Sequence, residues 1–299
     1  MKLTIAIVTW NRADQIKVAI ESCFKCNLPQ ETQFVVIDNA STDCTENAVK
    51  ELFIDNRYIL YYEKLPENIG CGNGRNYAYQ KCLGEYMYCL DDDAYIDTSK
   101  NKDFFIKAID ILDRHKEIAT LTTQIYDNVW ESNRVEIFGR EITPDLHRCL
   151  MFCGGSHFLR RSYFGNKNPY YANKYGYEEV LPSFKVYNDG CINAFAPNLL
   201  IIHNPKFDKW KQTNSANIEL LAKGLILKAK MKLKVFPLVY KPFVYLAMVM
   251  RIVKSKWALK VATQSILLYR ETKILPEQPF ILKFNKVKEL YEEFGFSIF

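Results

Sequence analysis

The first hundred residues alternate between short apolar runs and segments in which apolar residues recur at helical spacing. Such runs predict buried strands, and the helical spacing between them, as in Ala13–Phe24, predicts helices that cover a sheet. An alternation of this kind is typical of an α/β fold with a mostly parallel central sheet. The expected strands are Leu3–Val8, Gln33–Ile37, Tyr58–Glu63 and Glu85–Leu90.

Polar segments follow three of these strands, namely Thr9–Arg12, Asp38–Asp43 and the triad Asp91-Asp92-Asp93. Ligands of open α/β sheets bind beyond the carboxyl ends of the strands, so we expect the three segments to converge. Three adjacent carboxylates repel one another unless a cation or ligand neutralises them. Since Mg²⁺ binds carboxylates together with substrate phosphates, the triad indicates a site for metal and phosphate. The alternative is a solvated acidic loop.

The C-terminal part of the chain differs in charge. Leu220–Arg270 contains eleven lysines and arginines but no aspartate or glutamate, whereas the whole chain carries a net charge of +6. Its pattern predicts helices interrupted near Pro237 and Pro242. We expect a catalytic domain over residues 1–212 and a basic, aromatic-rich helical region over 213–299. Basic amphipathic helices lie on anionic membranes, and the alternative is a helical cap packed on the catalytic domain.

The spacing of the cysteines and the pattern at the start of the chain indicate the cellular compartment. The nine cysteines have no regular spacing, which indicates free thiols in a reducing cytoplasm. Cys23-x-x-Cys26 has no second pair of this kind, which favours packing over a redox or zinc site. A strand opens the chain, so secretion is not expected. No apolar stretch approaches the ~20 residues that span a bilayer. We expect a cytoplasmic protein that associates peripherally with the inner face of the membrane through residues 220–270.

The motifs along residues 3–205, taken in order, resemble those of the inverting GT-A glycosyltransferases of glycosyltransferase family 2. The resemblance implies a Rossmann-like GT-A sandwich, a nucleotide-sugar donor and inversion at the anomeric carbon. No single motif is decisive, but their order is specific. The segments that carry it are Ile7–Arg12, Val36–Asp43, the glycine-rich Asn68–Asn76, Leu90–Asp93 at the position of the DXD motif, Cys153–Ser156, Gly176–Glu179 and His203–Pro205.

The resemblance also implies roles for residues at the donor site. Asp38 would accept a hydrogen bond from a pyrimidine ring, which favours UDP-sugars over dTDP-sugars, although it could instead cap the next helix. Arg75, expected to begin a helix after the Asn68–Gly74 loop, would offer its planar fork to phosphate or base, or else lie on the surface. The donor-binding residues implied are Thr9, Asn11, Arg12, Asp38, Asn68, Gly70, Arg75, Asp91, Asp92, Gly154 and Gly155.

Metal binding and catalysis are assigned by the same resemblance. Asp93 and His203 would hold Mn²⁺ or Mg²⁺, which would neutralise the diphosphate leaving group. Glu179 would be the base that takes the proton of the acceptor hydroxyl, and Glu178 would orient the acceptor or assist. The family commonly has a further acid where this chain has Leu181, which weakens inferences about the acceptor. The alternative is a pair of exposed glutamates in a loop.

Other classes of protein fit the sequence less well. A nicotinamide dehydrogenase would place a G-x-G-x-x-G motif after the first strand, where this chain has no glycine. Binding of nucleic acid is not expected, because the acidic triad and the glutamate pair would repel a polyanion. The expected partners are therefore a nucleotide-sugar donor, a glycan or lipid-linked acceptor and an anionic membrane surface. A non-catalytic carbohydrate- or nucleotide-sugar-binding relative of the same fold remains the alternative.

Overall fold

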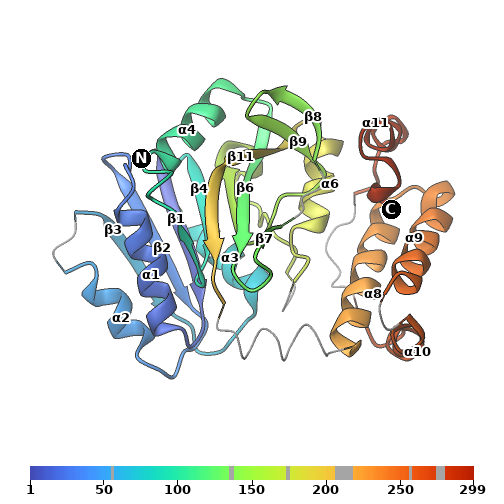
Figure 1. Ribbon diagram of the computed structural model, residues 1–299, viewed down its shortest axis with the longest axis horizontal. Coiled ribbons are helices and arrows are strands. Elements are labelled where there is room, and N and C mark those ends of the chain that lie inside the picture. Colours follow the sequence, from blue (N-terminus) through green and yellow to red (C-terminus); the bar gives the residue numbers. More distant parts are fainter. Residues whose placement is uncertain (55–56, 135–137, 173–175, 206–217, 256–257, 274–279) are drawn as a thin grey trace.

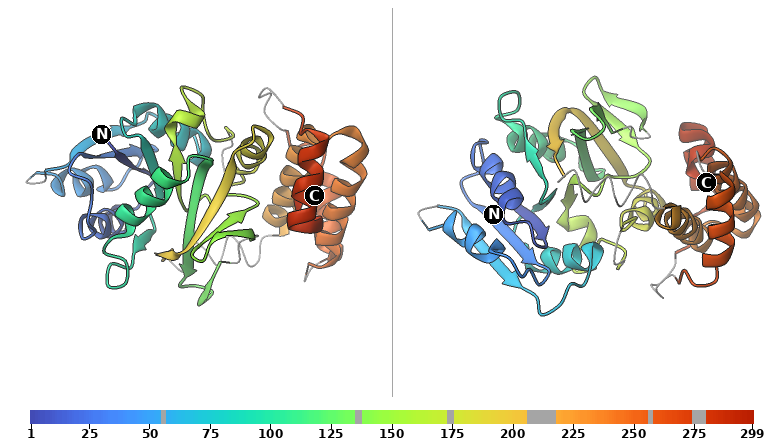
Figure 2. Two further views of the ribbon diagram at one scale, coloured as in Figure 1. Left: turned by 90° about the horizontal axis from the view of Figure 1, so that it is seen from above. Right: turned by 60° about the horizontal axis from the view of Figure 1, so that its bottom comes forward.

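The computed structural model describes residues 1–54, 57–134, 138–172, 176–205, 218–255, 258–273 and 280–299. A central sheet with helices on both faces forms one part of the molecule, and a group of helices from the C-terminal part of the chain packs at one end (Figure 1). Figure 2 shows the same division from two other directions.

The four strands that the apolar runs predict form the first half of the sheet, where they are parallel and lie in the order β3-β2-β1-β4. Alternate residues of β1 face opposite sides: Ile5 and Ile7 pack with α1 and α4, whereas Ala6 packs with α3. Burial on both faces explains why these strands are nearly continuous apolar runs. The elements of this half are β1 (Leu3–Thr9), α1 (Ala13–Phe24), β2 (Thr32–Asp38), α2 (Thr45–Glu51), β3 (Ile59–Lys64), α3 (Cys71–Lys81), β4 (Tyr86–Asp91) and α4 (Phe104–Arg114).

The glycine-rich segment differs from its prediction. The helix α3 begins at Cys71 rather than at Arg75, so Gly72 and Gly74 lie within its first turns. A Cβ atom at Gly74 would lie 2.7 Å from Cγ1 of Val8, which shows how closely α3 packs on β1. The glycine therefore allows a close approach of helix and strand, and loop conformation is needed only at Gly70, whose φ is +85°.

The second half of the sheet is mixed. Strand β10 (Ser156–Arg160) runs antiparallel between β4 and β6 (Ile118–Asp127), and β11 (Ile192–His203) runs parallel to β6. Strand β11 is one long strand with bulges, and β8 and β9 form an antiparallel pair after β7. The remaining elements are β5 (Ala94–Ile96), β7 (Ser132–Asn133), β8 (Phe138–Thr143), β9 (Leu146–Cys149), α5 (Arg161–Phe164) and α6 (Val180–Asn188).

The C-terminal helices share a hydrophobic core with the sheet-containing part. Phe184 of α6 packs with Met231 of α8 and Leu290 of α11 in one buried cluster. The expected division at residue 212 lies outside the described residues. No described helix is long and apolar enough to cross a membrane. The elements here are α8 (Ile218–Val235), η1 (Leu238–Tyr240), α9 (Lys241–Val253), α10 (Ala258–Leu268), α11 (Phe284–Phe294) and η2 (Gly295–Ile298), with Pro237 and Pro242 at the interruption between α8 and α9, as expected.

Candidate functional site

The three polar segments that follow the strands meet at one edge of the sheet, as predicted. Buried Thr9 pairs in register with Asp38, and the β1–α1 turn interlocks with the β2–α2 turn. The backbone N–H of Asn11 donates to Ser41 Oγ at 2.8 Å, and Asn11 Oδ1 accepts from the backbone N–H of Thr42 at 2.7 Å. Asn11 has a φ of +54°, a conformation that asparagine adopts more readily than most residues.

The three carboxylates of the triad have different surroundings. The guanidinium of Arg12 donates to Asp92 Oδ1 at 3.0 Å and to Asp93 Oδ2. Burial raises the pKa of Asp92 to about 7, an effect that the charge of Arg12 opposes. Burial also opposes ionisation of Asp93, but its hydrogen bond to His203 and the charge of Arg12 lower its pKa to about 2. A solvated acidic loop is therefore wrong for Asp92 and Asp93, because both are buried.

Asp91, Asp93 and His203 each turn one potential ligand atom toward a common point. These three atoms all lie within 4.8 Å of one another. Strand β5 pairs antiparallel with β11, which places His203 opposite Ala94 and hence beside Asp93. Two carboxylates and one imidazole form a donor set that suits Mn²⁺ and also offers Mg²⁺ its preferred oxygen ligands. The residues present therefore fit a divalent metal ion.

Asp127 orients the imidazole of His203 in this cluster. Nδ1 of His203 lies 2.8 Å from Asp127 Oδ2, and Nε2 lies 3.4 Å from Asp93 Oδ1. A hydrogen bond from Nδ1–H to Asp127 leaves the Nε2 lone pair for a metal, an arrangement common around metal-bound histidines. Sequence reasoning missed Asp127, although its position at the end of β6, on the same sheet edge as the triad, was an available signal.

Arg75 connects the triad to the glutamate pair. It is buried, so the alternative of a surface arginine is wrong. Its Nη2 donates to Asp91 Oδ1 at 2.5 Å, and its Nη1 donates to Glu178 Oε1. A Cβ atom on Gly154 would lie 3.0 Å from Arg75 Nη1, and one on Gly155 would lie 2.9 Å from Asp91 Oδ2. The two glycines thus make room for this ion-pair network, and their contact with donor stays a prediction.

Glu178 and Glu179 immediately precede α6. Glu178 is 4% exposed, and its Oε2 is buried without a hydrogen-bond partner among the described residues. Burial and the charge of Glu178 raise the pKa of Glu179, which is partly exposed, to about 8. The alternative of two exposed glutamates is therefore wrong for Glu178. A carboxyl group with a pKa near neutrality is suited to proton transfer.

Two residues that the resemblance assigns to donor binding, Asp38 and Asn68, make hydrogen bonds within the turns around the site. Asp38 is fully buried: its Oδ1 accepts from the backbone N–H of Ser41 and its Oδ2 from the hydroxyl of Tyr62, both at 2.7 Å. At the start of α2 the backbone N–H of Thr45 instead donates to the carboxylate of Asp43. Asn68 Oδ1 accepts from the N–H of Gly70 just before α3. Their contacts with a nucleotide stay predictions.

This geometry is accompanied by a clear family match. The sequence model of the family described as "Glycosyl transferase family 2" matches residues 4–167, which is more than half of the chain. The chain belongs to glycosyl transferase family 2. The matched segment contains the triad, Arg12 and Arg75, whereas Glu179 and His203 lie beyond it.

Curated relatives match a shorter segment. The poly(ribitol-phosphate) beta-N-acetylglucosaminyltransferase TarS of Staphylococcus aureus is 32% identical over 117 residues, which is 38% of this chain and 19% of TarS. The poly(ribitol-phosphate) beta-glucosyltransferase of Bacillus spizizenii is 28% identical over 97 residues, which is 32% of this chain and 15% of that protein. The chain thus spans less than a fifth of the length of these relatives.

Solved structures share the family 2 fold over most of the chain. S. aureus TarS 1–349 in complex with UDP-GlcNAc has a TM-score of 0.65 at 20% identity and covers 89% of this chain and 79% of that one. The mannosyltransferase PcManGT from Pyrobaculum calidifontis, in complex with GDP-Man and Mn²⁺, has a TM-score of 0.64 at 17% identity, with 92% and 76% covered. The predicted α/β architecture with C-terminal helices is confirmed.

Proposed function

We propose that this chain transfers a sugar from a nucleotide-diphosphate donor to a hydroxyl group of a glycan or lipid-linked acceptor, with inversion at the anomeric carbon. The observation that carries the proposal is the bridge that Arg75 makes between Asp91 and Glu178. It joins a cluster suited to a metal ion to a glutamate pair in which Glu179 has a raised pKa. A metal–diphosphate site beside a proton acceptor is what such a reaction requires.

Asp93 and His203 are proposed to hold Mn²⁺ or Mg²⁺, with Asp91 beside them. A divalent ion supplies positive charge for the diphosphate leaving group when it is bound. Arg12 already lies against Asp92 and Asp93, so its guanidinium is placed to contact the diphosphate as well. Asp91 is proposed to face the nucleotide ribose.

Glu179 is proposed as the base. Its carboxylate would take the proton of the acceptor hydroxyl while that oxygen forms a bond to the anomeric carbon. The bond between the anomeric carbon and the diphosphate would break on the opposite face, and its electron pair would leave with the diphosphate. Glu178 is held by Arg75, so it is proposed to assist by keeping the neighbouring Glu179 in place to receive the acceptor.

The donor is proposed to be a UDP-sugar, with dTDP-sugars as the second choice. Support comes from the place of Asp38 at the sheet edge, beside the triad, and from the binding of UDP-GlcNAc by the similarly folded TarS. The relatives named for poly(ribitol-phosphate) suggest that a phosphate-bearing polyol chain is one form of the acceptor. All nine cysteines are free thiols, which fits action in the reducing cytoplasm, on the inner side of the membrane.

The purified chain, incubated with UDP- and dTDP-sugars and Mn²⁺, tests this proposal through release of nucleoside diphosphate. We expect Glu179→Gln to bind donor like the wild type but to lose turnover. Glu21→Gln, on the exposed side of α1, is the matched control and is expected to retain turnover. If the wild type binds a nucleotide sugar and neither transfers nor hydrolyses it, the proposal is overturned in favour of a non-catalytic binding protein.

A further inference from the structure

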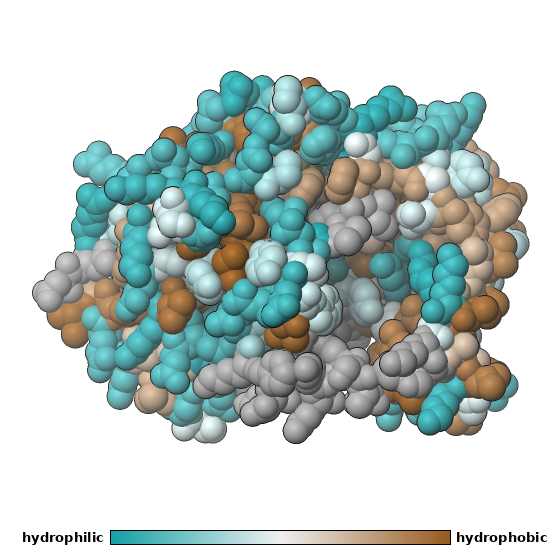
Figure 3. Space-filling view, viewed as in Figure 1, coloured by the Kyte–Doolittle hydropathy of each residue, from teal (hydrophilic) through white to brown (hydrophobic). Residues whose placement is uncertain are grey.

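The outer sides of α9 and α10 expose large apolar side chains. Val253 is 67% exposed, Leu259 86% and Ile266 77%, values that are high for residues of this kind. In Figure 3 hydrophobic residues gather at the end of the molecule formed by these helices. We call this surface the α9–α10 face; its members are Leu238, Val239, Leu246, Val249, Met250, Val253, Leu259, Ile266 and Leu267.

The periodicity of α9 shows that the exposure is not incidental. Val244, Ala247 and Ile252 are buried and pack toward the other helices, whereas Val249 and Val253 lie on the opposite side. The helix is therefore apolar on two sides, and within the described part of the chain only one of them is buried against other helices. Helices that are apolar all round are normally buried or in contact with lipid. Contiguous exposed apolar surfaces mark sites of interaction.

The charge around this face distinguishes between partners. Lys254, Lys260 and Arg270 are exposed beside it, and Leu220–Arg270 has no acidic residue. A second copy of the chain, related by two-fold symmetry, would bring the same basic patch against itself. An anionic lipid surface complements both the apolar side chains and the basic residues, because it offers acyl chains and negative headgroups.

Several basic residues of this segment are excluded from such a role by their internal contacts. Lys232 is buried, and its Nζ donates to the backbone carbonyl of Phe299 at 2.6 Å. Lys230 Nζ donates to the carbonyl of Thr272 at 2.7 Å and lies over the ring of Tyr269. Arg251 likewise donates to the backbone carbonyl of Phe299 at 3.1 Å, and Lys223 pairs with Glu219, whereas Lys254, Lys260 and Arg270 are exposed on the outer side.

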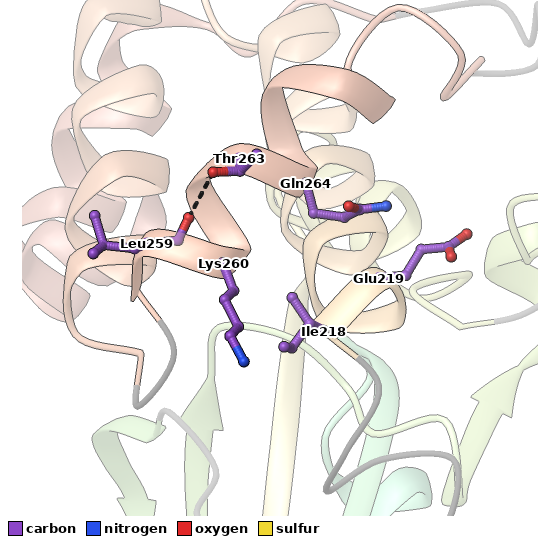
Figure 4. Close-up of a pocket in the computed structure, with 6 residues that line it drawn as sticks. All are labelled: Ile218, Glu219, Leu259, Lys260, Thr263 and Gln264. Carbon is purple, nitrogen blue, oxygen red and sulfur yellow. Dashed lines mark hydrogen bonds between the residues drawn. The ribbon is translucent and has the colours of Figure 1, made fainter.

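A hollow beside the face is not suited to a single anionic headgroup. It has a volume of about 510 Å³ and lies between α8 and α10 (Figure 4). Glu219 lines it together with Lys260, so an anion there would meet both charges. The apolar face with its exposed basic residues therefore carries the inference.

We propose that the α9–α10 face docks on the surface of an anionic lipid bilayer. Val253, Leu259 and Ile266 enter the boundary between headgroups and acyl chains, and Lys254, Lys260 and Arg270 contact the headgroups. Figure 1 shows α10 on the same side of the molecule as the carboxyl end of β11, where the candidate site lies. Docking would therefore bring the site toward the membrane, an orientation that suits a lipid-linked acceptor; this last point rests on the proposed function.

Flotation of the full chain with vesicles tests the docking directly. Phosphatidylcholine vesicles containing phosphatidylglycerol are compared with vesicles of phosphatidylcholine alone, at low and high salt. We expect binding to the anionic vesicles, weakened by salt because exposed charges are screened. The double substitution Val253→Asp and Ile266→Asp is expected to weaken it by about tenfold or more, because two apolar contacts are lost. The matched control, Ile54→Asp with Leu83→Asp, changes exposed apolar residues of the sheet-containing part and is expected to bind normally.

Unchanged circular dichroism and thermal unfolding establish that each variant is folded. Absence of flotation at low salt overturns the proposal, and so does equal binding to both kinds of vesicle. Analytical ultracentrifugation addresses the second copy: a wild-type dimer that Val253→Asp with Ile266→Asp converts to a monomer, with vesicle binding unaffected, also overturns it. The binding is measured without donor, so its failure is distinguishable from failure of the proposed glycosyl transfer.

Discussion

Arg12 donates a hydrogen bond to Asp92 at 3.0 Å and so brings a fixed positive charge into the acidic triad. The same guanidinium nitrogen also donates to Asp93, one of the three residues whose ligand atoms cluster. Arg12 thus neutralises part of the repulsion among the three carboxylates. A metal ion bound at the cluster would also reduce this repulsion, so Arg12 and the metal ion would stabilise the same carboxylates.

The first prediction concerns this internal cation. We expect Arg12→Gln to lower the thermal stability of the metal-free protein and to increase the stabilisation produced by Mn²⁺. The reason is that Mn²⁺ then relieves repulsion that the guanidinium relieves in the wild type. Thermal unfolding with and without Mn²⁺ measures both effects. Arg114→Gln breaks an exposed ion pair with Asp110 and serves as the control. An equal Mn²⁺ shift in Arg12→Gln and in the wild type would contradict this account.

The second prediction concerns the buried bridge. Arg75→Met is expected to cost about 3–5 kcal/mol of unfolding free energy, because it leaves Asp91 and Glu178 without their buried partner. Combining it with Glu178→Gln should cost less than the sum of the two single changes, since they share one interaction. Urea unfolding of the four proteins gives the coupling energy. Lys50→Met, which breaks an exposed pair with Glu46, is expected to leave stability nearly unchanged. Strictly additive effects would show that the bridge contributes nothing.

The third prediction is a pH dependence. If Glu179 is the base, turnover must rise as the pH increases through about 8, because only the ionised carboxylate accepts a proton. The unfolding free energy should respond in the opposite sense. The folded protein holds this proton above the ordinary pKa of 4.5, so the contribution of Glu179 to stability falls between pH 4.5 and 8. Glu179→Gln should remove that slope. A rate profile that stays flat across this range would argue for a different base.

The fourth prediction concerns the residue that orients the metal-binding imidazole. Asp127→Asn is expected to weaken Mn²⁺ binding by about 10–100-fold. The reason is that the acceptor of the hydrogen bond from His203 Nδ1–H, which leaves the Nε2 lone pair free for the metal, would then be neutral. Isothermal titration with Mn²⁺ alone measures this without any turnover. Asp110→Asn, an exposed change on α4, is the control. Full Mn²⁺ affinity in Asp127→Asn would show that the charge of Asp127 does not control metal binding through His203.

Local patterns were sufficient to predict the four parallel strands of the first half of the sheet, most of the helices that cover it and the meeting of the polar segments. They were insufficient at α3, where glycines in the sequence suggested a loop and the helix instead begins at Cys71. The reason is that a glycine permits either a turn or a close helix–strand contact, and only the position of Val8 against Gly74 distinguishes these. The contact of Asp92 with Arg12 was likewise not predictable from local patterns, because Arg12 lies in a turn 80 residues away.

The sequence by itself determined that the polar segments meet at one edge of the sheet, the chemical type of the site and the basic character of the last helices. Each of these depends on periodicity, on residue type or on the rule that parallel strands end at one edge. Only the tertiary structure decided that Arg75 is buried between Asp91 and Glu178, residues separated from it by 16 and 103 positions. Likewise, only packing decided which side of α9 remains exposed. Ion pairs and burial depend on distances in space, which spacing along a single chain does not specify.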